Sequence, residues 1–337
     1  MPDLNQAAQA LRLTLGDFLD RSGPEGVFHL APGGPGVLPA LADLDLPELH
    51  LDLLPEVPTP TQQHLLTRLG YLSLDALTWS HPGGWRLVIC IHGSGWRANQ
   101  AALSTWLREE PAAAQVYRQV FQRDGRISAD KTFLPAALSH YERTIGLQPL
   151  ADLATTLSSL TTPWMFAAGM ALDLHLGRVA RPHDDLDIIL DRSAQEEVIR
   201  LLKDWRLDVP TDGVYQPYRG HLYPSQHQIH ARHPELQGIL LVDLLLSDLS
   251  EGTWRYRRDP QITLPLSRAR QWSRQGWPYL ASEVVLLFKA ASVGRKIRDK
   301  DQADFDRVRP SLSATSLEWL KKTLTLTQPG HVWLEEL

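Results

Sequence analysis

The sequence predicts a mixed α/β protein built of two domains. Its 337 residues exceed the length that one hydrophobic core usually serves. Apolar residues make up 43% of the chain and charged residues 22%, which leaves enough apolar surface for a core in each half. In the second half, short apolar runs alternate with helical patterns, as in proteins whose helices pack on a sheet.

The first domain is expected to span residues 1–149. Proline and glycine in the segment 23–60 favour turns and short strands, and the apolar run at 85–92 favours a strand. Amphipathic patterns predict helices at 1–22, 103–123 and 131–143. Residues 146–149 have the composition of a linker, so we place the domain boundary near residue 150.

The second domain is expected to span residues 150–337, without an internal repeat at the residue level. Helices are expected at 150–160, 169–176 and 194–205. Strands are expected at 164–167, 185–190, 215–223, 226–232 and 238–245. From about residue 281 the patterns predict a helical tail, broken near 295–300 and 310.

Composition excludes several classes of protein. Cys90 is the only cysteine, so no intrachain disulfide forms, which fits a reducing cytosol. The chain opens without the basic and apolar regions of a signal peptide, and its longest apolar run is too short for a bilayer. We therefore expect a soluble, cytoplasmic protein without a membrane partner. The net charge of −5 argues against broad nucleic-acid binding and favours a cationic substrate only weakly.

The segment 164–187 carries the strongest chemical pattern. An apolar strand enters a turn of small residues and a short helix, and a second strand then opens with Asp185 and Asp187. Residues two apart in a strand point to the same side, so the two carboxylates face one spot. Backbone amides at the start of the helix can face a phosphate, and carboxylates suit Mg²⁺. The pattern predicts a site for Mg²⁺ and nucleotide phosphates.

This segment resembles the 2″-adenylyl type of aminoglycoside nucleotidyltransferase, within the superfamily related to DNA polymerase β. The matching text is Ala168-Gly169, Ala171-Leu172-Asp173, Gly177-Arg178 and Arg181-Pro182-His183-Asp184-Asp185-Leu186-Asp187. The resemblance, which covers about residues 150–337, implies a mixed sheet with a helical tail. It also implies a two-ion Mg²⁺ site, ATP as the donor and an aminoglycoside as the nominal acceptor, hence a role in antibiotic resistance. Ala168 departs from the family, which usually has a first glycine there.

Two-metal nucleotidyl transfer needs a third carboxylate. Asp243 is the candidate, because an aspartate within a run of leucine and valine is unfavourable to bury unless a partner compensates it. In the resembling family the equivalent aspartate is the third ligand or the general base. The alternative is an aspartate that caps a backbone amide at the end of a strand.

Further residues are candidates for binding the nucleotide. Gly169 begins the helix whose free amides would meet the β- and γ-phosphates. Arg178 and Arg181 would either clamp phosphate or pair with aspartates, and His183 is either a structural histidine or a phosphate contact. Asp184 is expected to point to the opposite face.

The tail adds Lys289, because it resembles the family pattern Leu-Leu-x-Lys followed by Lys-Asp-x-x-Asp-Phe, here Lys300 to Phe305. Lys289 is expected either to reach the phosphates or, as we favour, to form ion pairs together with Lys300 and the aspartates Asp301 and Asp304.

Two other patterns are excluded. Residues 89–96 resemble the oxyanion strand of α/β-hydrolases, but the chain has no Gly-x-Ser-x-Gly pentapeptide for the nucleophile. The histidines match no standard zinc spacing; they are His221, His227, His230 and His233.

The first half resembles the GrpB-like family, a distant nucleotidyltransferase relative. The likeness rests on Leu69-Gly70-Tyr71, His92, Leu107-Arg108-Glu109-Glu110-Pro111, Tyr117 and Lys131. The family's His-x-Gly-Ser-Thr motif is not preserved, since the nearest text is His29 to Gly33, and the acidic residues Asp43, Asp45 and Asp52 form no clear pair. We therefore expect a degenerate α+β copy that shapes the acceptor pocket or mediates dimerisation.

The sequence thus favours an Mg²⁺-dependent enzyme that moves AMP from ATP to a hydroxyl group of a small molecule. Two alternatives stay open. One is a nucleotidyltransferase that modifies a protein or an RNA, and the other is a nucleotide-binding or regulatory protein without turnover.

Overall fold

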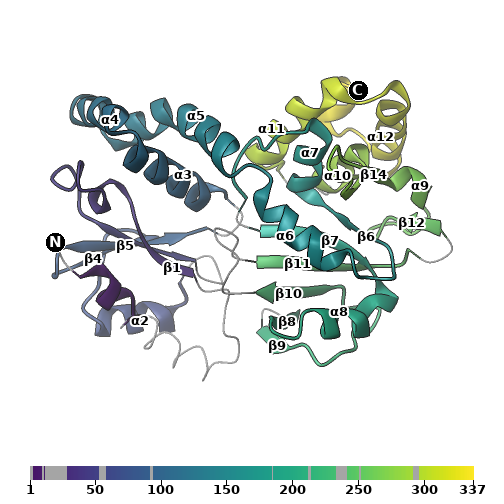
Figure 1. The fold of residues 1–337 in the computed structure, drawn as a ribbon, viewed down its shortest axis with the longest axis horizontal. Coiled ribbons are helices and arrows are strands. Elements are labelled where there is room, and N and C mark those ends of the chain that lie inside the picture. Colours follow the sequence, from purple (N-terminus) through teal and green to yellow (C-terminus); the bar gives the residue numbers. More distant parts are fainter. Residues whose placement is uncertain are drawn as a thin grey trace. The chain divides into compact units, whose positions relative to one another are not determined.

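The structure, a computed structural model, describes residues 3–9, 11, 29–52, 58–91, 94–183, 185–211, 214–232, 241–249, 252–290 and 296–337. It is a mixed α/β fold of two compact units (Figure 1). The first unit comprises residues 1–146 together with 180–184 and 210–216, and the second comprises 147–179, 185–209 and 217–337. The chain therefore enters the second unit at Leu147 and returns twice to the first.

The first unit is a five-stranded sheet with helices on both sides (Figure 1). In spatial order its strands are β1 (His29–Gly33), β2 (Glu48–Asp52), β5 (Trp85–Cys90), β4 (Thr78–His81) and β3 (Leu72–Ser73). Only the β2–β5 pair is parallel. The helices are α2 (Pro60–Arg68), α3 (Trp96–Glu109), α4 (Pro111–Asp124) and α5 (Arg126–Thr144).

The two faces of this sheet differ in chemistry because side chains alternate along each strand. Leu49, Leu51, Leu87 and Ile89 form an apolar cluster with Leu66 of α2. Glu48 and Arg86 lie at the alternate positions of the same strands, and Glu48 contacts both Arg86 and Arg126, at the start of α5. One face thus holds an apolar core and the other holds charged groups.

The second unit is built on an eight-stranded mixed sheet. In spatial order its strands are β14 (Arg270–Trp272), β15 (Pro278–Leu280), β6 (Trp164–Phe166), β7 (Asp185–Asp191), β11 (Leu241–Ser247), β10 (Gln228–Arg232), β8 (Arg206–Thr211) and β9 (Val214–Pro217). The strands β12 (Thr253–Arg255) and β13 (Thr263–Pro265) pair separately.

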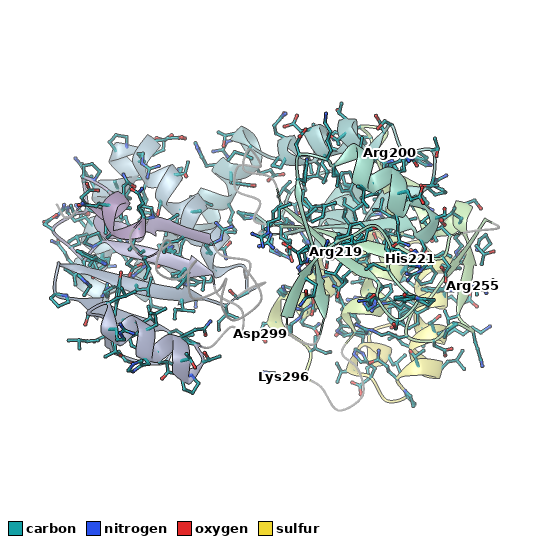
Figure 2. All side chains as sticks on the ribbon, turned by 90° about the horizontal axis from the view of Figure 1, so that it is seen from below. Arg200, Arg219, His221, Arg255, Lys296 and Asp299 are labelled. Atoms are coloured by element: carbon teal, nitrogen blue, oxygen red, sulfur yellow. The ribbon has the colours of Figure 1, made fainter. Side chains whose placement is uncertain are left out.

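Seven helices are described in this unit: α6 (Gln148–Leu157), α7 (Ala168–Leu176), α8 (Gln195–Leu201), α9 (Leu266–Ala269), α10 (Ser282–Lys289), α11 (Asp299–Val308) and α12 (Ala314–Thr327). The central strands β7 and β11 carry the core, with Leu186, Ile188, Val242 and Leu244 fully buried. The outer side of α8 meets solvent, where Arg200 is exposed (Figure 2).

Several expected elements were wrong in extent. The helix expected at 103–123 is two helices, because Pro111 disfavours helical backbone at Glu110 and begins α4 instead. The helix expected at 194–205 ends at Leu201, and β8 follows it. The strand expected at 215–223 ends at Pro217. Strands of three residues, such as β12 and β14, are too short to show a period of two.

Other expectations agree with the structure or fall outside it. Helical tail segments α10, α11 and α12 are separated near residues 295–300 and 310, as expected. Most of the helix expected at 1–22 lies outside the described residues, as do His92, Asp184 and His233. None of the described helices combines the length and the apolar character that a membrane span needs.

Candidate active site

Strands β7 and β11 bring the predicted carboxylates together. The two strands are parallel neighbours, and Asp187 and Asp243 are partners in their register. Asp185 opens β7 and lies on the same face as Asp187, because side chains two apart in a strand share a face. Three acidic residues therefore stand near the beginning of two adjacent strands.

Helix α7 begins beside these carboxylates. The backbone N–H of Ala167 donates a hydrogen bond to the carbonyl oxygen of Asp187 over 2.8 Å, which ties the turn before the helix to β7. No side chain caps the start of α7. Its first backbone amides, including that of Gly169, are therefore suited to hold an anion.

Ala168 adopts a backbone conformation that favours glycine. Its φ of 47° is the only positive φ of a non-glycine residue in the described part of the chain. For a residue with a Cβ this conformation costs about 1–2 kcal/mol. Alanine in place of the family's first glycine therefore strains the turn that faces the proposed phosphates.

We expect Ala168→Gly to raise the thermal unfolding midpoint by about 2 °C, because relief of the strained φ outweighs the larger backbone entropy of glycine in the unfolded chain. Calorimetry measures this midpoint. Ala171→Gly is the matched control, since Ala171 lies in the interior of the same helix and glycine there is destabilising by about 1 kcal/mol. Equal losses of stability in both variants would contradict strain at Ala168.

Electrostatic repulsion is built into the site. The pKa of Asp187 is raised well above its ordinary value because burial disfavours the charged form and because Asp185 and Asp243 repel it. Lys289 and Lys300 offset part of this effect. The group is therefore poised to gain from a bound cation.

One carboxylate oxygen of Asp243 accepts a hydrogen bond, and the other has no hydrogen-bond partner. Gln228 Nε2 donates a hydrogen bond to Oδ2 over 2.9 Å, whereas Oδ1 is buried without a hydrogen-bond partner and lies 3.7 Å from His230 Nε2. Burial raises the pKa of Asp243 to about 7. Asp243 can therefore accept a proton or a metal near neutral pH.

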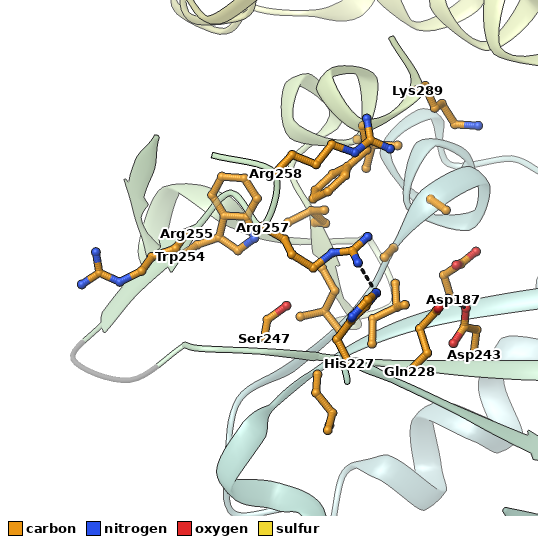
Figure 3. A pocket seen from close by; sticks show the side chains of 18 of the residues that line it. Asp187, His227, Gln228, Asp243, Ser247, Trp254, Arg255, Arg257, Arg258 and Lys289 are labelled. Atoms are coloured by element: carbon orange, nitrogen blue, oxygen red, sulfur yellow. Dashed lines mark hydrogen bonds between the residues drawn. The ribbon is translucent and has the colours of Figure 1, made fainter. Parts of the chain in front are cut away.

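A cavity of about 400 Å³ lies next to these residues, within the second unit (Figure 3). Asp187 and Asp243 line one side of it, together with Ala167 and Ala168 at the start of α7. The other walls come from the sheet, the segment after β12 and α10, and they include Ile189, Leu245, Ser247, Trp254, Val285, Phe288 and Lys289.

Sequence reasoning missed the arginines of this cavity, although Arg255, Arg257 and Arg258 stand close together in the sequence. Arg257 is hydrogen-bonded to His227, and the guanidinium of Arg258 lies 5.5 Å from the centre of the Phe288 ring (Figure 3). Arg255 projects away from the carboxylates and is exposed (Figures 2 and 3). A nucleotide triphosphate is an anion, so Arg257 and Arg258 are candidates to bind it.

Lys289 lines the cavity and is also buried in an ion cluster. Its Nζ lies 2.9 Å from Asp301 Oδ1 and 2.8 Å from Asp304 Oδ2. Arg307 joins Asp304 to Asp173 with two contacts of 2.8 Å. The cluster thus connects α10, α11 and α7. The ion pairs that we favoured for Lys289 are present, and its contact with a nucleotide stays a prediction.

The structure does not bring the remaining candidates into the lining of this cavity. Arg178 follows the end of α7 and is exposed. Arg181 and His183 belong to the short segment Ala180–Asp184, which groups with the first unit. Their roles in nucleotide binding stay predictions.

The carboxylates fit Mg²⁺ by their chemistry. Magnesium prefers hard oxygen ligands, and Asp243 Oδ1 is a buried oxygen without a hydrogen-bond donor. Among the described residues, no group of three or more histidine, cysteine, aspartate or glutamate side chains has the geometry of a metal site. Asp185, Asp187 and Asp243 therefore offer the right donors without forming a closed cage.

Comparison with known proteins finds a family model that matches this segment. Residues 149–259 match the family model described as aminoglycoside-2″-adenylyltransferase. No curated protein sequence matches the chain.

Solved structures of nucleotidyltransferases show a weaker likeness. The solution structure of the antibiotic-resistance factor ANT(2″)-Ia has 17% identity and a TM-score of 0.39, covering 53% of this chain and 91% of that protein. Lincomycin-bound LnuA, a lincosamide adenylyltransferase, has 18% identity and a TM-score of 0.37, covering 48% and 95%. A nucleotidyltransferase of Thermotoga maritima has 14% identity and a TM-score of 0.29, covering 52% and 92%.

The matched segment includes the turn at Ala168 and the carboxylates of Asp185, Asp187 and Asp243. Over residues 149–259 the chain is therefore similar to the aminoglycoside-2″-adenylyltransferase family, the relationship that the sequence predicted.

Proposed function

We propose that the second unit transfers AMP from ATP to a hydroxyl group of a small molecule in an Mg²⁺-dependent reaction. The register of β7 and β11 supports this proposal most directly, because it sets Asp187 and Asp243 side by side and keeps Asp185 on the same face. These carboxylates lie next to the uncapped start of α7. Metal-ligand and phosphate-binding groups thus meet at one cavity.

Each residue has a separate task in this proposal. Bound Mg²⁺ would neutralise phosphate charge and orient the triphosphate, and Asp185, Asp187 and Asp243 would hold it. The amides at the start of α7 face the β- and γ-phosphates, with Arg257 and Arg258 as further contacts.

Asp243 would either complete the metal site or take the proton of the acceptor hydroxyl, because burial raises the pKa of this carboxyl to about 7. The acceptor oxygen attacks the α-phosphorus, its proton passes to Asp243 in the second case, and pyrophosphate leaves. Catalysis then depends mainly on positioning and on charge neutralisation.

The nominal acceptor is an aminoglycoside, which the family suggests. A protein or RNA acceptor remains an alternative, since none of the cavity residues by itself identifies the acceptor. A nucleotide-binding protein without turnover is the second candidate, and Ala168 favours it because alanine with a φ of 47° strains the turn at the start of α7, where the phosphates are proposed to bind.

Thermal shift with ATP separates these candidates. We expect millimolar ATP to raise the unfolding midpoint only when Mg²⁺ is present, since a ligand that binds the folded state stabilises it. Pyrophosphate release should then follow when an aminoglycoside panel that includes tobramycin is added. A metal-dependent shift without pyrophosphate release on any aminoglycoside excludes these acceptors and supports either the binding protein or a protein or RNA acceptor. The absence of any shift contradicts the proposed site.

A further inference from the structure

The two units arrange their central strands in the same way. In the first unit the order is β1-β2-β5-β4-β3, and in the second the order β6-β7-β11-β10-β8 forms the centre of the larger sheet. In each set the second and third strands of the order are parallel, and all other neighbours are antiparallel. The order along the chain also corresponds, apart from the added β9. The sequence showed no such repeat at the residue level.

The turn after the first strand extends this correspondence to single residues. In the first unit Gly34, with a φ of 74°, leads from β1 into the short helix Pro35–Val37. In the second unit Ala168, with a φ of 47°, leads from β6 into α7. Gly34 and Ala168 therefore occupy equivalent positions, each just after the first strand.

Strand register then identifies the counterparts of the carboxylates. Gly33 pairs with Glu48, and Ala167 hydrogen-bonds to Asp187, so Glu48 stands at the position of Asp187. Across the parallel pair, Glu48 is the partner of Arg86, as Asp187 is the partner of Asp243.

Arg86 thus stands where the second unit has its third carboxylate. A guanidinium group replaces a carboxylate at this point, which reverses the local charge.

The first unit satisfies its carboxylate with fixed cations. Glu48 is only 1% exposed, and Arg126 contacts both of its oxygens, at 2.5 and 3.0 Å. Arg86 lies 3.2 Å from Oε1, and His50 Nε2 lies 2.9 Å from Oε2. Two arginines face the single negative charge of Glu48, and Asp45 adds a second negative charge through a 2.5 Å contact with Arg86. In the second unit, by contrast, Asp243 Oδ1 has no hydrogen-bond partner.

We propose that the first unit is a second nucleotidyltransferase core in which Arg86 and Arg126 occupy the place of the divalent cation. It therefore binds no metal, and metal binding is confined to the second unit. The inference uses the proposed metal site of the second unit as its reference position. The ion cluster around Glu48 lies in the first unit and does not depend on that metal site.

The test titrates Mn²⁺, a spectroscopic substitute for Mg²⁺, into the full chain and follows free Mn²⁺ by electron paramagnetic resonance. We expect Asp187→Asn combined with Asp243→Asn to remove all specific binding, and Glu48→Gln to leave the number of bound ions unchanged. Mn²⁺ that persists in the double variant and falls in Glu48→Gln would overturn the inference. Absence of Mn²⁺ binding by the unmodified chain would refute the proposed function but not the inference, which the next measurement then decides.

Thermal unfolding across pH tests the cluster itself. Burial alone would raise the pKa of Glu48, but hydrogen bonds from His50 and Arg126 outweigh it and hold the pKa at about 2. A carboxyl with a lowered pKa adds stability above its unfolded value of 4.5, and this stability is lost as the pH falls toward 2.

Glu48→Gln should therefore lower the midpoint by several degrees at pH 7 and by progressively less between pH 4.5 and pH 2. Arg86, Arg126, His50, Asp45 and Asp130 belong to the same cluster. The exposed Glu110 provides the control Glu110→Gln, for which no change is expected. Equal midpoints for Glu48→Gln and the unmodified chain at pH 7 would show that the cluster does not hold the first unit together.

Discussion

Asp187→Asn is expected to abolish AMP transfer while it stabilises the metal-free protein. A metal ion and its ligands contribute several kcal/mol of transition-state stabilisation, so pyrophosphate release should fall by roughly 10³-fold or more. Asparagine keeps the shape of aspartate but removes a charge that the proposed metal requires. The measurement is the rate of ATP-dependent pyrophosphate release with saturating Mg²⁺.

Stability should change in the opposite direction to activity. The pKa of Asp187 is raised in the folded protein, first by burial and then by Asp185 and Asp243. A carboxyl with a raised pKa destabilises the folded state once the pH exceeds its unfolded value, and the effect is complete above the folded value. Without metal, Asp187→Asn should therefore unfold at a higher temperature than the unmodified protein at pH 8, and the difference should vanish near pH 3.

The exposed residue Asp204 supplies the matched control, because Asp204→Asn also removes one negative charge from the second unit. It should leave both the rate and the midpoint unchanged. If Asp187→Asn retained activity, or if it destabilised the metal-free protein at pH 8, the proposed role of this carboxylate would be wrong.

Lys289→Met is expected to produce the largest loss of stability among single changes near the cavity. The methionine removes the ammonium group that Asp301 and Asp304 share, at 2.9 and 2.8 Å, while both aspartates remain almost completely buried. Removing one partner of a buried ion pair costs about 3–5 kcal/mol, because an uncompensated charge is left behind. For a unit of this size the unfolding midpoint should fall by about 10 °C.

Lys296→Met is the control for this change, since Lys296 is an exposed lysine in the same unit (Figure 2). The unfolding midpoint of Lys296→Met should stay within about 1 °C of that of the unmodified protein. The pair of variants also separates the two roles that the sequence left open for Lys289. If Lys289→Met kept the unfolding midpoint of the unmodified protein but bound ATP more weakly, Lys289 would serve the nucleotide rather than the ion cluster.

The local pattern around the site was visible in the sequence. The alternation of Asp185, Leu186 and Asp187 placed two carboxylates on one face, and the apolar neighbours of Asp243 marked it as an aspartate that needs a compensating partner. Ala168 stood out as the departure from a glycine, and its φ of 47° gives the physical reason why glycine suits that position. Such features depend on a few consecutive residues.

Pairing between distant segments was decided only in three dimensions. Periodicity could mark β7 and β11 as strands. It could not show that they lie side by side in parallel, with Asp187 level with Asp243. The arginines at 255, 257 and 258 belong to the cavity because β12 and the following turn pack beside α10 and the sheet. The equivalence of Glu48 and Arg86 with Asp187 and Asp243 likewise follows from register alone.

The sequence by itself determined that residues 164–187 set two carboxylates on one face of a strand after a turn of small residues, because strand alternation and such turns are local properties of the backbone. The tertiary structure decided which distant groups surround that motif: Gln228 and His230 at Asp243, and the aspartates that pair with Lys289. Burial and hydrogen-bond partners depend on packing between segments far apart in the chain, and these partners set the charges of the site.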